Sequence, residues 1–272
     1  ELQAHIDAHD LSVKIMQTYA NFTVGGSVSV NVHGRYIGHG PIISSVQRLQ
    51  LVLADGSVVE ASRDENPELF FAAVGGYGGI GVISEVTLDL APNVKVERET
   101  QTLPAAEYRA YFRNEIRDND KVVFHNGDIY PPDYDVVRDV SWYETDAALT
   151  IDDRLIPDDD DYTLLPMMVR FSNSGSFGRW FRRTVIDPLY YSSERVAWRN
   201  WEASYDVREL GEGDRSETTW VLQEYFIPVQ NFDSFVPKMR DVFEKYDVDV
   251  VNVSIRHALP DQESYLSWAR QE

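Results

Sequence analysis

Two glycine-rich runs in the first third of the chain have the composition of an anion-binding backbone. The first spans residues 23–34 and begins Thr-Val-Gly-Gly, and the second spans residues 75–83 and begins Gly-Gly-Tyr-Gly-Gly. Glycine has no Cβ, so backbone N–H groups in such runs can come close to a negatively charged ligand. The two runs therefore predict a site that holds an anionic group against bare backbone.

The sequence between and after the runs indicates the elements that position them. Residues 46–60 are typical of two strands joined at an Asp-Gly turn. Residues 66–73 predict a short helix with Asn66 as N-cap and Pro67 at its first position. Residues 82–90 alternate like a strand. Because the second run precedes a strand and not a helix, a Rossmann site for a nicotinamide cofactor is not expected.

In this order, residues 1 to about 92 resemble the second half of the FAD-binding domain of the vanillyl-alcohol oxidase and p-cresol methylhydroxylase (PCMH-type) superfamily. The likeness is to its sugar-lactone branch, which includes aldonolactone oxidases and decaprenylphosphoryl-ribose oxidase. Five ordered features carry the resemblance: a Thr-Val-Gly-Gly run, a His-Gly pair, an Ala-Asp-Gly hairpin, a Glu-Leu-Phe helix and the second glycine run. The resemblance implies FAD as cofactor.

The resemblance also implies which residues hold the cofactor. They are Thr23, Val24, Gly25 and Gly26 at the pyrophosphate, Val30, Asn31, Val32 and His33 beside the ribityl chain and flavin, and Ile83 at the adenine end. An isolated histidine is more often a structural group, so a structural role for His33 is the alternative.

The family has further parts at both ends. An N-terminal subdomain supplies the main phosphate-binding loop and often a histidine bonded to flavin, and a later lysine or arginine faces the flavin. Only residues 1–22 precede the first run here. We therefore expect an internal fragment, incomplete at both ends, with the catalytic base outside the chain and with FAD held from one side only.

The character of the sequence changes at residue 93, which predicts domains at 1–92 and 93–272. In the second part, residues 95–100, 122–130 and 136–143 predict strands and residues 104–117 a helix. Apolar residues between 162 and 201 recur at helical spacing.

The last unit predicts a strand at 218–227, a helix at 232–246 and a strand at 248–256. This β-α-β order suggests a ferredoxin-like α+β substrate (cap) domain and an α+β fold overall. It agrees with the substrate domain of the resembled family.

Alternation along these strands selects the substrate-binding candidates. Gln223 and Tyr225 share one face of their strand, and Asn252, Ser254 and Arg256 share one face of theirs. By resemblance, Gln223 and Asn252 fall where the family has a substrate-facing glutamine and an asparagine. The alternative for this set is a solvated strand face.

Composition excludes several other classes. The net charge of −20 opposes nucleic acid and anionic membranes as partners, and the absence of cysteine excludes thiolate metal sites and cysteinyl flavin links. No apolar run approaches the roughly 20 residues of a transmembrane helix. Six aspartates within 152–161 could bind calcium, but the run lacks the glycine and glutamate of an EF-hand loop, which favours a solvated loop, and we expect no metal site.

These observations indicate an FAD-dependent oxidoreductase. The expected reaction oxidises an alcohol carbon of a sugar, aldonolactone or polyol by hydride transfer to flavin N5, with a small sugar or lactone as partner. The alternatives are oxidation of a lipid-linked pentose, or a non-catalytic sugar-binding or interaction protein on a degenerate flavin fold.

Overall fold

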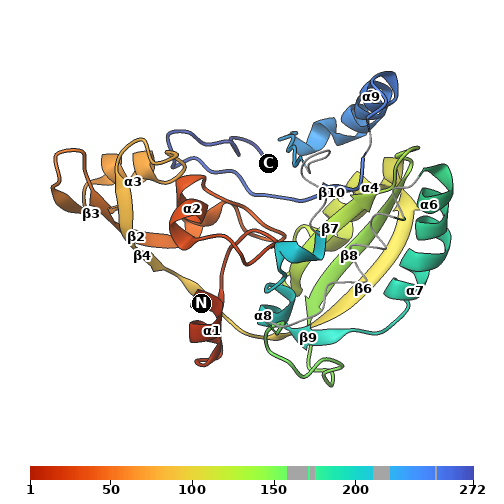
Figure 1. The fold of residues 1–272 in the computed structure, drawn as a ribbon, viewed down its shortest axis with the longest axis horizontal. Coiled ribbons are helices and arrows are strands. Elements are labelled where there is room, and N and C mark those ends of the chain that lie inside the picture. The colour runs from red at the N-terminus through yellow and green to blue at the C-terminus, as the bar shows by residue number, and fades with distance from the viewer. Residues whose placement is uncertain (158–170, 172–174, 211–220, 249) are drawn as a thin grey trace.

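The computed structural model describes residues 1–157, 171, 175–210, 221–248 and 250–272. Helices and antiparallel sheets form two lobes that lie side by side, with the N-terminal elements in one and the larger sheet in the other (Figure 1). The expected α+β fold class is confirmed.

A three-stranded antiparallel sheet, ordered β3-β2-β4, forms the first lobe. Its helices and strands are α2 (Val24–Ser29), η1 (Ile42–Ser45), β2 (Val46–Val52), β3 (Val58–Ser62), α3 (Pro67–Ala73) and β4 (Val82–Leu88). The predicted hairpin is present, because Gly56 adopts φ +82° at the turn and Leu51 pairs with Val59. The apolar face of this sheet is fully buried at Leu49 and Leu51, against Phe70 of α3.

Asn66 and Pro67 begin α3 as expected, but Asn66 does not cap the helix with its side chain. Its amide donates instead to the carbonyl of Glu60, at 2.7 Å. The side chain thereby joins the helix to β3, and its backbone takes the left-handed conformation at φ +47°.

The second lobe is built on a five-stranded antiparallel sheet in the order β10-β7-β8-β6-β9. Its elements are β6 (Lys95–Pro104), α4 (Ala105–Tyr111), η2 (Phe112–Ile116), β7 (Val122–Ile129), β8 (Val136–Glu144), α6 (Ser176–Phe181), η3 (Arg182–Ile186), α7 (Asp187–Tyr191), β9 (Val196–Trp198), α8 (Arg199–Glu202), η4 (Val207–Leu210), η5 (Val229–Asn231), α9 (Phe232–Lys245) and β10 (Val253–Ile255). Helices α4 and α9 cover one face, where Tyr108 and Met239 pack against Ile129 and Val137. Tyr191 of α7 packs on the opposite face, with its ring 4.6 Å from the Arg138 guanidinium.

A shared core joins the two lobes. Strands β1 (Leu11–Val13) and β5 (Leu90–Pro92) pair beside α1 (Leu2–Asp7). Tyr36, which follows the first glycine run, packs with Phe124 and Trp142 of the large sheet. The proposed boundary at residue 93 falls between β5 and β6, and the division into two domains stays a prediction.

Three predicted elements differ from the structure. Residues 221–227 form no strand, because β10 and not this segment pairs with β7, while residues 218–220 lie outside the described part. The strand predicted at 248–256 is shorter in the structure and spans Val253–Ile255. It pairs with β7 only along Gly127 to Ile129. Within residues 162–201, where the apolar spacing predicts helix, Val196–Trp198 is instead an edge strand that pairs with β6.

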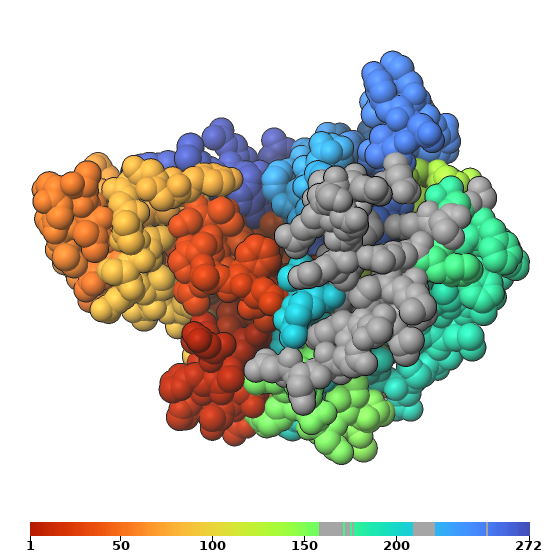
Figure 2. Space-filling model, in the orientation of Figure 1, coloured from red at the N-terminus to blue at the C-terminus, as the bar shows by residue number. Residues whose placement is uncertain are grey.

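The C-terminal segment, residues 256–272, returns from the large sheet and runs along the first lobe (dark blue in Figure 1). Leu259 N–H donates to the carbonyl of His39, and Tyr265 N–H donates to that of Phe71, both at 3.1 Å. In the space-filling view, this segment lies along the upper side of the first lobe, and α9 projects beyond the large sheet (Figure 2).

Candidate functional site

The first glycine run folds into the short helix α2, which leaves bare backbone at its start. The Thr23 hydroxyl accepts from Gly26 N–H at 3.1 Å. The N–H groups of Val24 and Gly25 belong to the first turn, where no carbonyl lies four residues earlier. A Cβ added at Gly25 would meet no atom within 4 Å, whereas one at Gly26 would lie 2.9 Å from the Thr23 hydroxyl. Gly25 therefore offers free space for a ligand, and Gly26 is needed for the cap.

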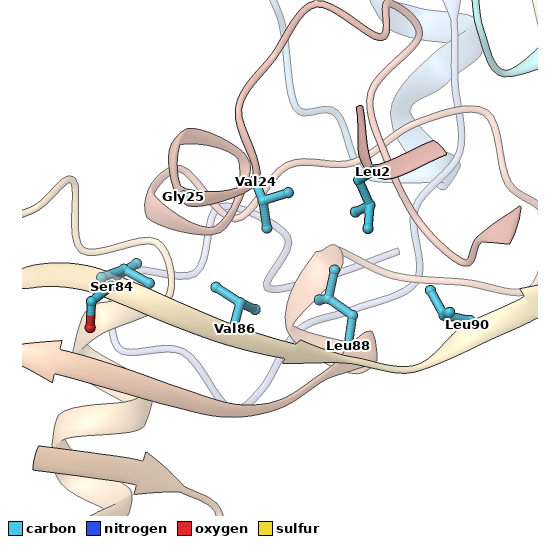
Figure 3. Close-up of a pocket in the computed structure, with 8 residues that line it drawn as sticks. Leu2, Val24, Gly25, Ser84, Val86, Leu88 and Leu90 are labelled. Atoms are coloured by element: carbon cyan, nitrogen blue, oxygen red, sulfur yellow. The ribbon is translucent and has the colours of Figure 1, made fainter. Parts of the chain in front are cut away.

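A pocket of about 310 Å³ opens beside Gly25 (Figure 3). Its lining comes from α1, α2, β4 and β5: Leu2, Val24, Gly25, Ile83, Ser84, Val86, Leu88 and Leu90. In Figure 3 the Val24 side chain faces Val86 across the pocket. The structure thus brings three predicted cofactor residues, Val24, Gly25 and Ile83, to one mostly apolar pocket.

Unlike its neighbours Val30 and Val32, Asn31 has a buried side chain that uses both its amide nitrogen and its oxygen in hydrogen bonds within the protein. The residue has φ +51°, its amide donates to Asp261 at 2.9 Å, and its carbonyl oxygen accepts from Ile43 N–H at 3.1 Å. Val30 ends α2 and is 39% exposed, and Val32 bonds through its backbone to Ser27 and Ile42. Asn31 thus fastens the C-terminal segment.

Asn31→Ala is expected to lower the free energy of unfolding by about 1–3 kcal/mol, because Ile43 N–H and Asp261 would lose a buried partner. Urea unfolding followed by fluorescence measures the change. Asn114→Ala, at an exposed position of η2, is the matched control. Equal stability of the Asn31 variant and the parent would contradict the assignment.

His33 lies in an aromatic and acidic surround. Its Nε2 is 3.3 Å from Glu224 Oε1, and its ring lies 4.8 Å from Trp268 and 6.1 Å from Phe226. The hydrogen bond from His33 holds the pKa of Glu224 below its ordinary value. His33 Nδ1 is buried without a hydrogen-bond partner in the described structure, as is the Thr18 hydroxyl. These two atoms are therefore available to form hydrogen bonds with a bound molecule.

The two substrate-binding candidates on residues 221–227, Gln223 and Tyr225, lie in different surroundings. Tyr225 packs on Phe235 of α9 at 5.6 Å, and Gln223 is exposed. The alternate residues, Glu224 and Phe226, are the ones that reach His33. Sequence reasoning missed Glu224 and Phe226. They alternate with Gln223 and Tyr225 along residues 221–227, and this alternation was the signal that could have identified them.

The third group of candidates lies on the face of the large sheet opposite α4 and α9. Ser254 pairs with Asp128, so both point to that face, together with Asn252 and Arg256. Asn252 Nδ2 lies 3.5 Å from Asp128 Oδ1. The charge of Arg256 interacts with the carboxylates of Asp128 and Glu224, and burial lowers the pKa of Arg256. Arg256 Nε is buried without a partner among the described residues.

We call this set of groups the polar track, and it consists of His33, Glu224, Arg256, Asp128 and Asn252. It runs from the first glycine run, through residues 221–227, to the large sheet. It therefore joins predicted cofactor residues to predicted substrate residues.

The described residues hold no group of three or more histidine, cysteine or acidic side chains that could bind a metal ion. Of the aspartate cluster, residues 158–161 lie outside the described part. No helix within the described ranges is long and apolar enough to cross a membrane.

This geometry fits a dinucleotide cofactor. Gly25 and the adjoining pocket offer room, and the Thr18 hydroxyl and His33 Nδ1, which have no hydrogen-bond partner among the described residues, offer polar groups. Residues 1–62 match the family model of the FAD binding domain. This segment is thus part of an FAD-binding domain, and FAD is its cofactor.

Curated relatives agree with this assignment. The chain is 38% identical over 96 residues to cytokinin dehydrogenase 4 of Oryza sativa subsp. japonica, an alignment covering 35% of this chain and 18% of the relative. It is 36% identical over 96 residues to an alditol oxidase of Streptomyces sp., covering 35% of this chain and 23% of that protein. The chain therefore matches about a fifth of each relative's length.

A solved cholesterol oxidase from Brevibacterium sterolicum has the same fold, with a TM-score of 0.62 at 14% identity over 93% of this chain and 53% of that one. The comparisons support the PCMH-type family of FAD-linked oxidoreductases predicted from the glycine runs.

Proposed function

We propose that the protein oxidises an alcohol carbon of a polyol, sugar or aldonolactone, using FAD as hydride acceptor. The observation that carries the proposal is the polar track, which links His33 in the FAD-binding segment to the charged face of the large sheet. Carboxylate, guanidinium and amide groups together suit a substrate with several hydroxyl groups, because each buried polar group then finds a partner.

In this proposal the first lobe holds the cofactor. The backbone of Thr23 through Gly26 binds the pyrophosphate, Ile83 borders the adenine, and residues 30–33 lie along the ribityl chain and flavin. Asn31 contributes through its backbone, since its side chain is engaged by Asp261. When bound, FAD supplies the hydride acceptor at N5.

The second lobe orients the substrate. Arg256 and Asn252 hydrogen-bond the hydroxyl groups next to the reacting carbon, and Gln223 and Tyr225 border the entrance from residues 221–227. Arg256 is suited to the role because its guanidinium is desolvated and its Nε has no hydrogen-bond partner in the described part of the chain. A positioned donor of this kind lowers the barrier by fixing the C–H bond relative to its acceptor.

The alditol oxidase supports an alcohol substrate through its 36% identity to this chain over 96 residues. We infer the sugar-lactone branch from the ordered motifs of the glycine runs. Oxidation of a lipid-linked pentose is the second candidate within that branch. A non-catalytic sugar-binding protein would have the same polar track but no flavin reduction.

The test is anaerobic mixing of the FAD-loaded protein with alditols, aldohexoses and aldonolactones, one class at a time. Loss of the visible absorbance of oxidised flavin is expected with at least one class. If none of them reduces a protein that binds FAD, the proposed activity is wrong.

Gln223→Ala is expected to slow flavin reduction by the best substrate and to leave the spectrum of bound flavin unchanged. Loss of one substrate-orienting amide costs about 1–3 kcal/mol in the transition state, or roughly 5- to 150-fold in rate. Gln230→Ala, another exposed glutamine, is the control. Stopped-flow absorbance measures the rate, and an unchanged rate for Gln223→Ala would remove this residue from the site.

A further inference from the structure

Asp128 is the carboxylate of the polar track that lies on the large sheet. It lies on β7 between Arg138 of β8 and Ser254 of β10, its two partners in register. Its neighbour Ile129 packs under α9, so Asp128 points to the opposite face of the sheet. The side chain is half-buried there.

The groups that face Asp128 come from three directions. Amides approach from the sheet, at Asn252 with a distance of 3.5 Å and at Asn126. Arg182 and Asp187, from η3 and α7, act on its charge with opposite signs, and Arg256 attracts it from beyond β10. Asp128 also raises the pKa of Tyr191. Burial outweighs the attractions and raises the pKa of Asp128.

The other carboxylates near the track are already committed. Glu224 is paired with His33 at 3.3 Å. Asp187 accepts from the Tyr130 hydroxyl at 2.7 Å and lies 3.6 Å from Arg182. Asp128, by contrast, is contacted by two neutral amides, Asn252 at 3.5 Å and Asn126. A carboxylate has about four acceptor sites on its two oxygens, so a substrate hydroxyl can also donate to Asp128.

In place of the base expected outside residues 1–272, we infer that Asp128 is the catalytic base, and that it accepts the hydroxyl proton of the alcohol during oxidation. The inference rests on the proposed function. In the step, the substrate O–H bond breaks and its proton passes to an Asp128 oxygen. As the substrate C–H bond breaks and the carbon–oxygen double bond forms, the C–H electron pair and hydrogen leave together as hydride, and bound FAD would supply the acceptor. The two electrons that the substrate loses would thus be taken up by FAD.

A buried carboxylate of this kind also affects the pH dependence of stability, which can be measured without the cofactor. Because the folded state raises the pKa of Asp128, the native protein binds this proton more tightly than the unfolded chain. The ionised side chain therefore destabilises the fold. This penalty is absent at low pH, grows as pH rises from the unfolded pKa to the folded pKa, and is complete above the folded pKa. A neutral side chain of the same shape removes the penalty.

The experiment compares Asp128→Asn with the parent in two measurements. In the FAD-loaded protein, flavin reduction by the best substrate is expected to slow at least about 100-fold, the lower limit for a lost general base. In the cofactor-free protein, Tm is expected to be higher for Asp128→Asn at pH 7 to 8, and the difference to disappear near pH 4. Asp120→Asn, at an exposed position before β7, is expected to change neither quantity.

Reduction within threefold of the parent would overturn the inference, and so would a lower Tm for Asp128→Asn across the whole pH range, which indicates a structural carboxylate. If the variant does not fold, the pH profile of the parent decides. Its reduction rate should fall below an apparent pKa higher than the ordinary aspartate value of about 3.9, and a rate that is flat down to pH 4 would overturn the role. Failure of every alcohol to reduce the parent would instead contradict the proposed function.

Discussion

Gly25→Val is expected to weaken FAD binding at least about 100-fold while leaving the Tm of the cofactor-free protein nearly unchanged. The added side chain would meet no protein atom within 4 Å at Cβ, so the fold tolerates it. It would nevertheless occupy the space through which the N–H groups of Val24 and Gly25 reach the pyrophosphate. Each charged hydrogen bond lost costs about 1.5–3 kcal/mol, and two bonds together give the expected loss.

Calorimetric titration of FAD measures the affinity, and differential scanning calorimetry measures Tm. Ala106→Val introduces the same side chain near the start of α4, far from the glycine runs in sequence, and should change neither quantity. Gly26→Val is less informative, because its Cβ would press on the Thr23 hydroxyl and lower Tm as well. Unchanged FAD affinity for Gly25→Val would place the pyrophosphate elsewhere.

Glu202→Gln is expected to lower the free energy of unfolding by about 3–5 kcal/mol, since it breaks a buried ion pair and leaves Arg35 without its counter-charge. Arg35 Nη1 lies 2.6 Å from Glu202 Oε1, with side-chain exposures of 11% and 3%. Arg35 also donates to the Glu202 backbone carbonyl at 3.0 Å. Burial raises the pKa of Glu202, and the attraction of Arg35 opposes this rise.

Chemical unfolding of the parent and of Glu202→Gln measures the loss. The double variant Arg35→Met, Glu202→Leu should recover part of it, because no unpaired charge remains buried. Asp241→Asn, in the exposed pair with Arg240, should stay within about 0.5 kcal/mol of the parent. A loss no larger than that of Asp241→Asn would show that the pair contributes little.

Local sequence patterns were sufficient where an element depends on its own residues. The Asp-Gly turn with its two strands, the Asn66-Pro67 helix start and the α9 period all formed at the predicted places. In each case turn chemistry or helical periodicity acts within one segment.

Patterns failed where the choice of a partner is not local. Residues 221–227 have the alternation of a strand, yet β10 pairs with β7 and the segment has no ladder. Alternation also cannot tell which parity of residues 221–227 contacts His33, so the strand pattern indicates Gln223 and Tyr225 and does not single out Glu224. The Asn31–Asp261 bond links residues 230 positions apart, a distance that no sequence window covers.

The return of residues 256–272 to the first lobe has a thermodynamic consequence. This one segment carries Arg256 at its start and fastens to Asn31 through Asp261 and through Trp268, whose indole donates to the Asn31 carbonyl at 2.9 Å. A fluctuation that frees it exposes both halves of the site in a single cooperative opening. A molecule that binds at one end and stabilises the closed segment therefore favours binding at the other end. Two such molecules change each other's affinity by the same factor, because the linkage is reciprocal.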